Sequence, residues 1–238
     1  MAIDAEAHHH YGIQVVWPAC ASELEVEGQV ADGLAVVASG QPHRLSMPSG
    51  ILLLVEPRSD LGEALQAFLA GQPVRWVVSE PALRPCRPSP ALLESGLNAE
   101  GLAPLWRAIG IPGACGFWAH WQSREQMDSR IARLLGSLDD CFQSECIKPA
   151  SWRASEVAKS LALSESRFLH LFRQEMGIAW RPYLLWRRLL CAVNVLRHGG
   201  NATDAAHTAG FSDNAHLSRT FRSNFGMSIR QALAVMER

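Results

Sequence analysis

The segment AGFSDNAHLSRTFRSNFG, residues 209–226, combines an apolar stripe with side chains that can bind bases and phosphates. Phe and Leu recur at helical spacing, while Asn, His and Arg fall on the other side of the same helix. Asparagine and arginine can each form paired hydrogen bonds with base edges, and arginine also pairs with phosphate. The segment therefore predicts a helix that is held to a small core by one face and offers the other face to a nucleic acid.

The same arrangement occurs twice in this part of the chain. One copy spans residues 154–184 and the other 202–233, about 48 residues apart. Each copy has a short first helix, a tight turn, a serine placed to cap the next helix (Ser164 or Ser212), and a second helix that ends at glycine. A long helix over 183–200 is expected to join them. This order predicts two helix-turn-helix units, in each of which the second helix enters the major groove of DNA.

Charge divides the chain near residue 150. Residues 1–150 carry 10 Lys and Arg against 17 Asp and Glu, a net charge of −7, whereas residues 151–238 carry 12 against 6, a net charge of +6. The basic part therefore suits a polyanionic partner. The start of the chain lacks a secretory pattern, and no run has the ~18–20 apolar residues that a membrane span requires. We expect a cytoplasmic protein with reduced thiols and no membrane partner.

The acidic part begins with patterns typical of strands and continues with helices. Runs rich in Val, Ile, Leu and Trp predict strands over 12–17, 34–39, 51–57 and 74–78. The run ILLLV is apolar on both faces, which favours a central strand covered on both sides. Helical spacing predicts helices over 61–71, 97–110 and 123–143, the first of them stopping at Gly71. Four prolines make residues 81–90 a loop or an extended crossing.

The helix over 123–143 carries its own apolar stripe, and its expected role is a contact between domains or between two copies of the chain. The stripe consists of Met127, Ile131, Leu134, Leu135 and Leu138. Pro149 ends the helical pattern, so the boundary before the basic part is predicted within 148–152.

Three motifs of the basic part together point to a known family. They are the helix ends LFRQEMG and TFRSNFG, the RLLCA run at 188–192, and the AGFSDNAHLSRTF core. On these motifs the segment of about 150–236 resembles the AraC/XylS family of bacterial transcription regulators. The resemblance implies two recognition helices in successive major grooves on one face of DNA. The chain departs from the family pattern at Trp180 and Ile229, where Pro is usual, and at Ala205, where Ile is usual. Looser local packing or a changed direction of the loop is the expected consequence.

The resemblance also implies which residues contact DNA. In the first recognition helix the DNA-contacting set is Ser166, Arg167, Leu169, His170 and Arg173; in the second it is Asn214, Ala215, His216, Arg219 and Arg222. Arg173 and Arg222 lie farther along each helix and suit phosphates, which fix register without reading sequence. The plain alternative is that these positions are merely solvated surface. Arg188, in the joining helix, is expected to form an internal salt bridge instead.

In terms of the family, the N-terminal part would be a small cupin-like β-barrel that senses an effector. AHHHYGIQVV, residues 7–16, is similar to the His-x-His entry of a cupin strand, with Gln14 where metal-binding cupins often place Glu. SGQPHRL supplies His43, similar to the second cupin motif. His8, His10 and His43 could meet around one divalent metal ion. Alternatively His10, Gln14 and His43 contact an organic effector, or the domain only dimerises.

Two sets of cysteines are candidates for a chemical role. Cys141 and Cys146, with Cys115, are candidates for a redox or soft-metal switch. The string RPCRP around Cys86 is similar to the cysteine of alkyl-transfer repair proteins, although it lacks the adjoining His. Reduced, inert thiols are the simpler expectation.

The sequence thus predicts an α+β protein with a cupin-like sensor domain over 1–120, a helical linker or dimerisation element over 121–149, and an all-α double helix-turn-helix domain over 150–238. The expected function is a sequence-specific DNA-binding transcription regulator that responds to a small-molecule effector and is not an enzyme. Its expected partners are double-stranded DNA, the effector, RNA polymerase if it activates transcription, and a second copy of the chain. No cofactor is expected beyond the candidate metal ion. The alternatives are a cupin-type metal enzyme fused to a DNA-binding module and a DNA binder without an effector.

Overall fold

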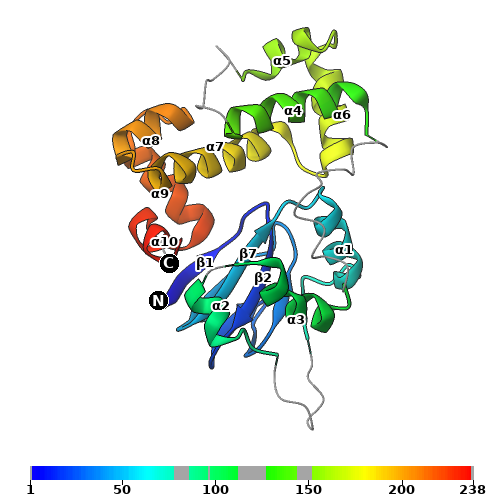
Figure 1. Cartoon of the computed structure of the whole chain (residues 1–238). Helices are drawn as coiled ribbons and strands as arrows, with labels where there is room; N and C mark the ends of the chain where they lie inside the picture. The colour runs from blue at the N-terminus through cyan, green and yellow to red at the C-terminus, as the bar shows by residue number, and fades with distance from the viewer. Residues whose placement is uncertain (1, 78–85, 96, 112–126, 144–151, 237–238) are drawn as a thin grey trace. The chain divides into compact units, whose positions relative to one another are not determined.

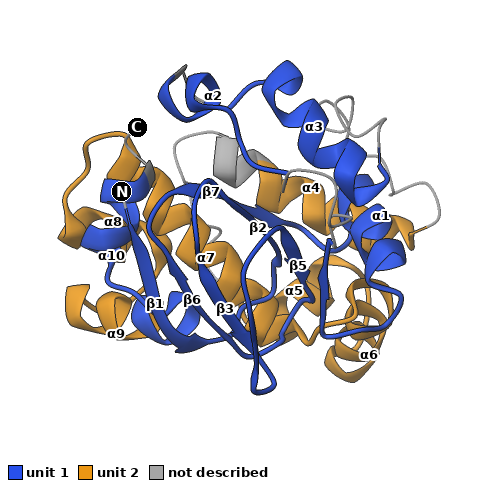
Figure 2. Ribbon diagram, turned by 90° about the horizontal axis from the view of Figure 1, so that it is seen from below, with its two compact units in different colours: residues 1–122, 221–238 blue, residues 123–220 orange. Residues whose placement is uncertain are grey.

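The computed structural model describes residues 2–77, 86–95, 97–111, 127–143 and 152–236. The chain divides into two compact units (Figure 2). Unit 1 comprises Met1–Gln122 together with Phe221–Arg238, and unit 2 comprises Ser123–Thr220. The elements are labelled in Figure 1.

Unit 1 contains a first antiparallel sheet whose two faces differ in polarity. Its strands are β1 (Ile3–His8), β3 (Glu23–Val26), β4 (Gln29–Ala31) and β6 (His43–Met47), in the order β1-β6-β3-β4. Along β6 the side chains of His43, Leu45 and Met47 are buried, while Arg44 between them is exposed. This alternation places one face of the sheet in the interior of unit 1.

A second antiparallel sheet contains the four strands that the sequence predicts. Its strands are β2 (Ile13–Pro18), β5 (Ala35–Val37), β7 (Gly50–Val55) and β8 (Val74–Trp76), in the order β7-β2-β5-β8. The α+β class is confirmed, but the two sheets are not closed into one barrel within the described residues. The four strands of the first sheet were not predicted from sequence, because they are short or carry charged residues at alternate positions.

The covered central strand of the second sheet is β2 and not β7. Every residue of β2 is buried, since it pairs with β5 on one side and β7 on the other. The ILLLV run lies in β7 at the edge of the sheet, where buried and half-buried side chains alternate. The prediction of a doubly covered ILLLV strand was therefore wrong. A continuous apolar run does not by itself reveal which strand has two neighbours.

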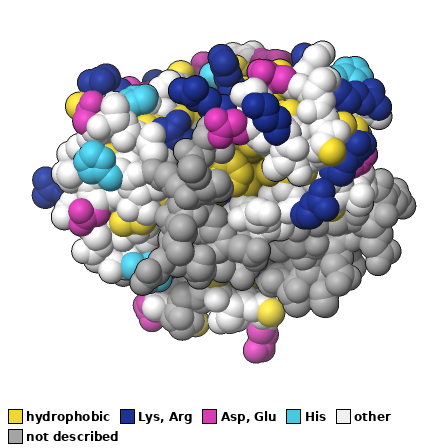
Figure 3. Space-filling view, turned by 90° about the horizontal axis from the view of Figure 1, so that it is seen from above, with side chains coloured by type: hydrophobic (Ala, Val, Ile, Leu, Met, Phe, Trp, Pro, Cys, Tyr) yellow, Lys and Arg dark blue, Asp and Glu magenta, His cyan; other side chains and the backbone are white. Residues whose placement is uncertain are grey.

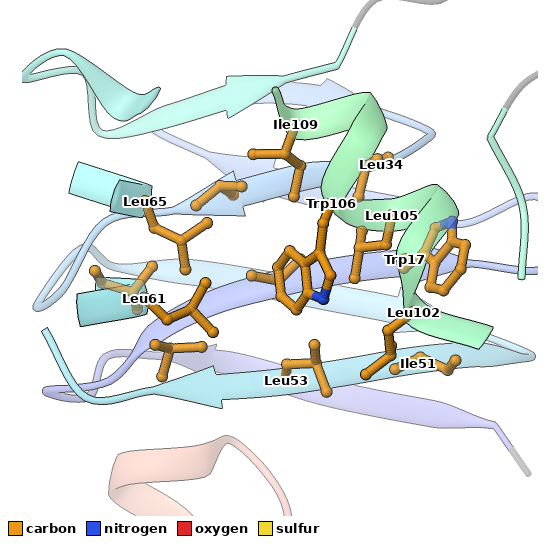
Figure 4. Packing of buried hydrophobic residues seen from close by; sticks show 14 of the residues in the cluster. Trp17, Leu34, Ile51, Leu53, Leu61, Leu65, Leu102, Leu105, Trp106 and Ile109 are labelled. Atoms are coloured by element: carbon orange, nitrogen blue, oxygen red, sulfur yellow. The ribbon is translucent and has the colours of Figure 1, made fainter. Parts of the chain in front are cut away.

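Helices cover one face of the second sheet and form the main core of unit 1. They are α1 (Asp60–Leu69), α2 (Pro90–Ser95) and α3 (Ala99–Ile109). Trp106, which is fully buried, lies among leucine and isoleucine side chains from the helices and strands (Figure 4). Ser59 caps α1 by accepting a hydrogen bond from the N–H of Gly62 at 3.0 Å. At the other end Ala70, in the left-handed conformation, ends the helix one residue before the predicted Gly71.

Unit 2 is helical, and its helices follow the predicted order. They are α4 (Ser129–Gln143), α5 (Ala154–Ser160), α6 (Glu165–Met176), α7 (Trp180–Arg197) and α8 (Ala202–Ala209), followed by α9 (Asn214–Phe225), which continues into unit 1. The last helix, α10 (Ile229–Met236), belongs to unit 1. The joining helix begins at Trp180, earlier than predicted, because Pro182 lies in its first turn, where the missing N–H has no helical partner to lose.

The apolar stripe of α4 is used inside the chain. Ile131, Leu134, Leu135 and Leu138 are each at most 6% exposed. The helix contacts α7, where Arg187 donates hydrogen bonds of 2.8 Å to the Asp139 carboxylate and to the carbonyl of Leu138. Because the stripe is already covered in one chain, a dimer would have to use another surface. None of the described helices is long and apolar enough to cross a membrane.

Candidate functional site

The first helix-turn-helix pair, α5 and α6, holds its second helix by an aromatic core. Ser164 caps α6 as predicted, accepting a hydrogen bond from the N–H of Arg167 at 3.3 Å. Phe168 and Phe172 are fully buried on the inner side of α6. On the outer side all five residues predicted to contact DNA are exposed: Ser166, Arg167, Leu169, His170 and Arg173.

An aromatic residue replaces the family's usual proline beside this core. Trp180 is 1% exposed and lies edge-on to Phe168 and Phe172, at ring-centroid distances of 5.4 and 5.0 Å. Its indole N–H donates to the carbonyl of Trp152 at 3.1 Å. The expected loosening at this position is therefore absent. Ala205, the other buried departure, is fully enclosed in α8.

The second pair, α8 and α9, turns at Gly210, whose φ of 82° lies in the left-handed region that favours glycine. The cap of α9 is Asp213, whose carboxylate accepts a hydrogen bond from the N–H of His216 at 2.7 Å. This hydrogen bond is the largest cause that lowers the pKa of Asp213. The prediction of Ser212 as the cap was wrong by one residue: its hydroxyl donates to the Asp213 carboxylate at 3.0 Å and supports the cap from outside.

The outer side of α9 carries the groups that can recognise bases. Asn214, Ala215 and Arg219 are exposed, whereas Leu217 on the inner side is fully buried. The amide oxygen of Asn214 accepts from the Ser218 hydroxyl at 3.2 Å, an exposed hydrogen bond that water or a base edge can replace. Arg219 thus has the exposure that a guanine or phosphate contact requires.

Two of the predicted DNA-contacting residues have specific partners within the chain. His216 is partly buried, and its ring lies edge-on to Phe211 at a centroid distance of 5.3 Å. Arg222 forms an ion pair with Glu6 at 2.8 Å, and both side chains are more than half exposed. An exposed pair of this kind contributes little to stability, so Arg222 can exchange its partner at low cost.

Arg188 is half-buried and hydrogen-bonded within the chain, but its hydrogen-bond partners are carbonyl groups, so the predicted salt bridge is not found among the described residues. Its Nε donates to the carbonyl of Ala209 at 2.8 Å, and Nη2 donates to the carbonyl of Gly210. The guanidinium group also lies over the Phe211 ring, 4.3 Å from its centroid. Arg188 therefore ties the joining helix α7 to the turn that precedes α9. These contacts give Arg188 a structural role.

The charge distribution agrees with these two exposed helix faces. Residues 151–238 carry 12 Lys and Arg against 6 Asp and Glu. Lys and Arg side chains recur across the face drawn in Figure 3. A polyanion such as the DNA backbone is the partner that suits this excess of positive charge.

Comparison with known proteins identifies this fold. The family described as "Helix-turn-helix domain" matches residues 157–234, which run from within α5 through α9 and include the joining helix α7. The HTH-type transcriptional activator RhaS of Escherichia coli is 36% identical over 110 residues, which are 46% of this chain and 37% of RhaS. Residues 157–234 therefore form a helix-turn-helix domain of this family. The chain's match to RhaS spans little more than a third of that relative's length.

Solved structures of ToxT share the overall fold of this chain. ToxT from Vibrio cholerae, bound to (E)-4-(8-methylnaphthalen-1-yl)but-3-enoic acid, has a TM-score of 0.53 at 11% identity and covers 99% of this chain and 95% of ToxT. A second ToxT structure, bound to an unsaturated fatty acid, has a TM-score of 0.51 at 11% identity, covering 99% of this chain and 91% of ToxT. At this identity the likeness establishes the fold alone.

The N-terminal residues singled out from sequence come together in unit 1. His8, His10 and His43 are buried, and one ligand atom of each lies within 4.8 Å of the others. Gln14 is also buried, with its Oε1 3.1 Å from His10 Nε2. The sequence motifs thus predicted a real cluster, although not its ligand.

The two hypotheses on cysteine chemistry have different outcomes. Cys115 and Cys146 lie outside the described residues, as does the side chain of Cys141, so the switch remains a prediction. Cys86 is half-buried, and burial raises the pKa of its thiol. A raised pKa disfavours the thiolate that an alkyl-transfer reaction needs.

Proposed function

We propose that this chain is a sequence-specific DNA-binding transcription regulator that responds to a small-molecule effector. The observation that carries the proposal is the pair of capped helices, α6 and α9, whose inner faces are buried and whose outer faces carry exposed groups that bind bases and phosphates. The AraC/XylS-type domain and the activator RhaS among its relatives support it.

The two helices differ in what they can read. On α9, Asn214 suits a paired contact with adenine and Arg219 a paired contact with guanine. On α6, Leu169 is 37% exposed and suits the methyl group of thymine. Arg173, one helical turn beyond Leu169, suits phosphate and fixes the register of the protein on DNA.

The effector is proposed to act through the N-terminal part of the chain. The ToxT structures, of the same overall fold, are bound to an unsaturated fatty acid and to a synthetic carboxylic acid. An organic effector bound in the N-terminal part of the chain is accordingly part of the proposal. Contact with RNA polymerase and formation of a homodimer belong to it as further expectations, the dimer through a surface other than the α4 stripe.

A cupin-type metal enzyme fused to a DNA-binding module is the second candidate. The observation that favours it is the cluster of His8, His10 and His43. However, the cluster found among the described residues contains histidines and no carboxylate to act as a general base. We therefore propose a regulator without enzymatic activity.

The test begins by selecting bound sequences from a pool of random duplexes, because the selection reveals the target sequence that the protein itself prefers. The affinity for the selected duplex should fall steeply with salt, by about 0.9 log units per phosphate contact for each tenfold rise in concentration. Arg219→Ala should lower the affinity and relax the preference at one base pair, at a cost of about 1–3 kcal/mol.

Arg107→Ala is the matched control, since Arg107 is exposed on α3 and its loss changes the net charge equally. If no sequence is enriched, or if both variants bind the selected duplex equally well, the proposal is wrong.

A further inference from the structure

Three histidines of unit 1 form a buried cluster that the DNA-binding function does not use. His8, His10 and His43 are each at most 7% exposed, and one nitrogen of each lies within 4.8 Å of the others. We propose that these three imidazoles bind a divalent transition-metal ion, with the amide oxygen of Gln14 as a fourth ligand. The proposal is independent of DNA binding and stands on the geometry of the cluster.

The cluster is assembled from both sheets of unit 1. His8 at the end of β1 is the register partner of His43 at the start of β6, so the two lie side by side in the first sheet. Their rings are 4.3 Å apart between centroids. Gln14 belongs to β2, the covered central strand of the second sheet. His10, in the connection from β1 to β2, completes the set. The backbone of both sheets therefore fixes the positions of the four side chains.

Hydrogen bonds set the same tautomer in all three rings. Each Nδ1 faces a backbone carbonyl two residues away: His8 that of Glu6 at 2.7 Å, His10 that of Gly12 at 3.0 Å, and His43 that of Gln41 at 2.9 Å. A carbonyl only accepts, so each of these three hydrogen bonds requires the hydrogen on Nδ1. In a neutral ring the lone pair is then on Nε2. This second-shell arrangement orients imidazoles as metal ligands in known sites.

Two polar atoms of the cluster lack the partners that a protein interior requires. Nε2 of His43 and Nε2 of Gln14 are buried without a hydrogen bond among the described residues. His10 Nε2 and Gln14 Oε1, 3.1 Å apart, are both acceptors once the His10 hydrogen is on Nδ1. A cation between these two atoms would be bound by both lone pairs, and it would also satisfy His43 Nε2.

The set of donor atoms suits the same role, because imidazole nitrogen is a common ligand of transition-metal ions. A cluster of three imidazoles and an amide oxygen, without a thiolate or carboxylate, suits Zn²⁺, Ni²⁺, Co²⁺ or Fe²⁺ rather than Ca²⁺ or Mg²⁺. Since Zn–N bonds are about 2.0–2.1 Å long, binding should draw the rings slightly inwards.

The test uses the full chain, freed of any histidine tag and treated with a chelator, and titrates it with Co²⁺ and Zn²⁺. Co²⁺ should give visible absorption bands of a nitrogen- and oxygen-ligated ion, without the ultraviolet band of a cobalt–thiolate bond, at one equivalent. Zn²⁺ should displace Co²⁺ and raise the melting temperature. No binding, or a spectrum dominated by thiolate ligands, would overturn the proposal.

Two variants and one control assign the site. His43→Ala should weaken Co²⁺ binding by at least ~100-fold, while His9→Ala, which changes an exposed histidine on the same segment, should leave it unchanged. Gln14→Glu should tighten binding about tenfold, because a carboxylate replaces the amide oxygen. This second variant remains decisive if His43→Ala does not fold. Equal affinity in the wild type, His43→Ala and Gln14→Glu would refute the assignment.

Discussion

In the first helix-turn-helix unit aromatic rings surround the recognition helix, whereas in the second a guanidinium group and small side chains hold the turn before it. Phe168, Phe172 and Trp180 pack edge-to-face beneath α6. Leu217 and Phe221 are buried beneath α9, and the turn before it is held by Arg188, which binds the carbonyls of Ala209 and Gly210. The two units therefore share a backbone plan but differ in the kind of interaction that maintains it.

The difference extends to the outer faces. The first helix-turn-helix pair presents Ser166, Leu169 and His170 on α6, which offer small or apolar contacts. The second pair presents Asn214 and Arg219 on α9, which can form paired hydrogen bonds. We infer that the second helix-turn-helix pair supplies most of the discrimination between bases, whereas the first pair mainly anchors the protein on DNA. The predictions below separate these two roles, from the largest expected effect to the smallest.

Removal of the Trp180 ring, which packs beside α6, should have the largest effect on the stability of the protein. Trp180→Ala deletes a side chain that is 1% exposed and contacts two phenylalanine rings, so the free energy of unfolding should fall by about 3–5 kcal/mol. Chemical denaturation monitored by circular dichroism measures this change. Trp180→Phe retains most of the ring contacts and should cost clearly less. Equal losses in both variants would mean that the indole hydrogen bond to Trp152, not packing, holds the unit.

Removal of the Arg188 guanidinium group, which holds the turn before α9, should have the second largest effect on stability. Arg188→Met keeps the stem of the side chain but leaves the carbonyls of Ala209 and Gly210 without their donor, which should cost about 1.5–3 kcal/mol of stability. Thermal unfolding of the full chain is the measurement. Arg181→Met, an exposed arginine of the same helix, serves as the control and should change little. A stable Arg188→Met variant would contradict the proposed role of this tether.

The base-reading difference between α6 and α9 predicts unequal losses of specificity. Asn214→Ala should cost about 1–3 kcal/mol at one base pair of the selected duplex, because a paired contact with adenine disappears. Leu169→Ala removes only an apolar contact and should cost less. Competition binding against single-base variants of the duplex compares the two. A larger loss in Leu169→Ala would reverse the assignment of the reading unit.

The turns before α6 and α9 predict small changes in stability of opposite sign. Ala162 adopts a φ of 55° in the first unit, where an L-residue is strained, whereas Gly210 has a φ of 82° in the second. Ala162→Gly should therefore stabilise the protein and Gly210→Ala destabilise it, each by about 1 kcal/mol. Differential scanning calorimetry can resolve shifts of this size. Shifts of the same sign would show that side-chain contacts in the turns outweigh backbone strain.

Sequence patterns were sufficient to predict the helices of the basic part, whose stabilising interactions are local. The caps, turns and inner stripes of α5–α9 depend on residues a few positions apart, and the sequence predicted every one of these helices. It missed Asp213 as the cap of α9, because Ser212 and Asp213 are both good capping residues and only backbone geometry chooses between them. The burial of Trp180 was likewise hidden, since its partners come from α6 and from Trp152.

The N-terminal part shows the limit of the same reasoning. The apolar strands of the second sheet were predictable, but β1, β3, β4 and β6 were not, and β7 was assigned the central place that β2 occupies. Strand order depends on pairing between distant segments, which hydrophobic pattern alone does not encode. For the same reason the stripe of α4 could be predicted, but not that it is covered within one chain.

The amino-acid sequence by itself determined that this protein has a basic, helical part with two helix-turn-helix units, because helix periodicity, capping residues and charge depend on neighbouring residues. It also supplied the three histidines of unit 1. Only the tertiary structure decided that these histidines meet with a common tautomer in the interior of unit 1, because their convergence depends on the register between β1 and β6 and on a connection to β2. A metal ion would be recognised by that arrangement in space and not by any one segment.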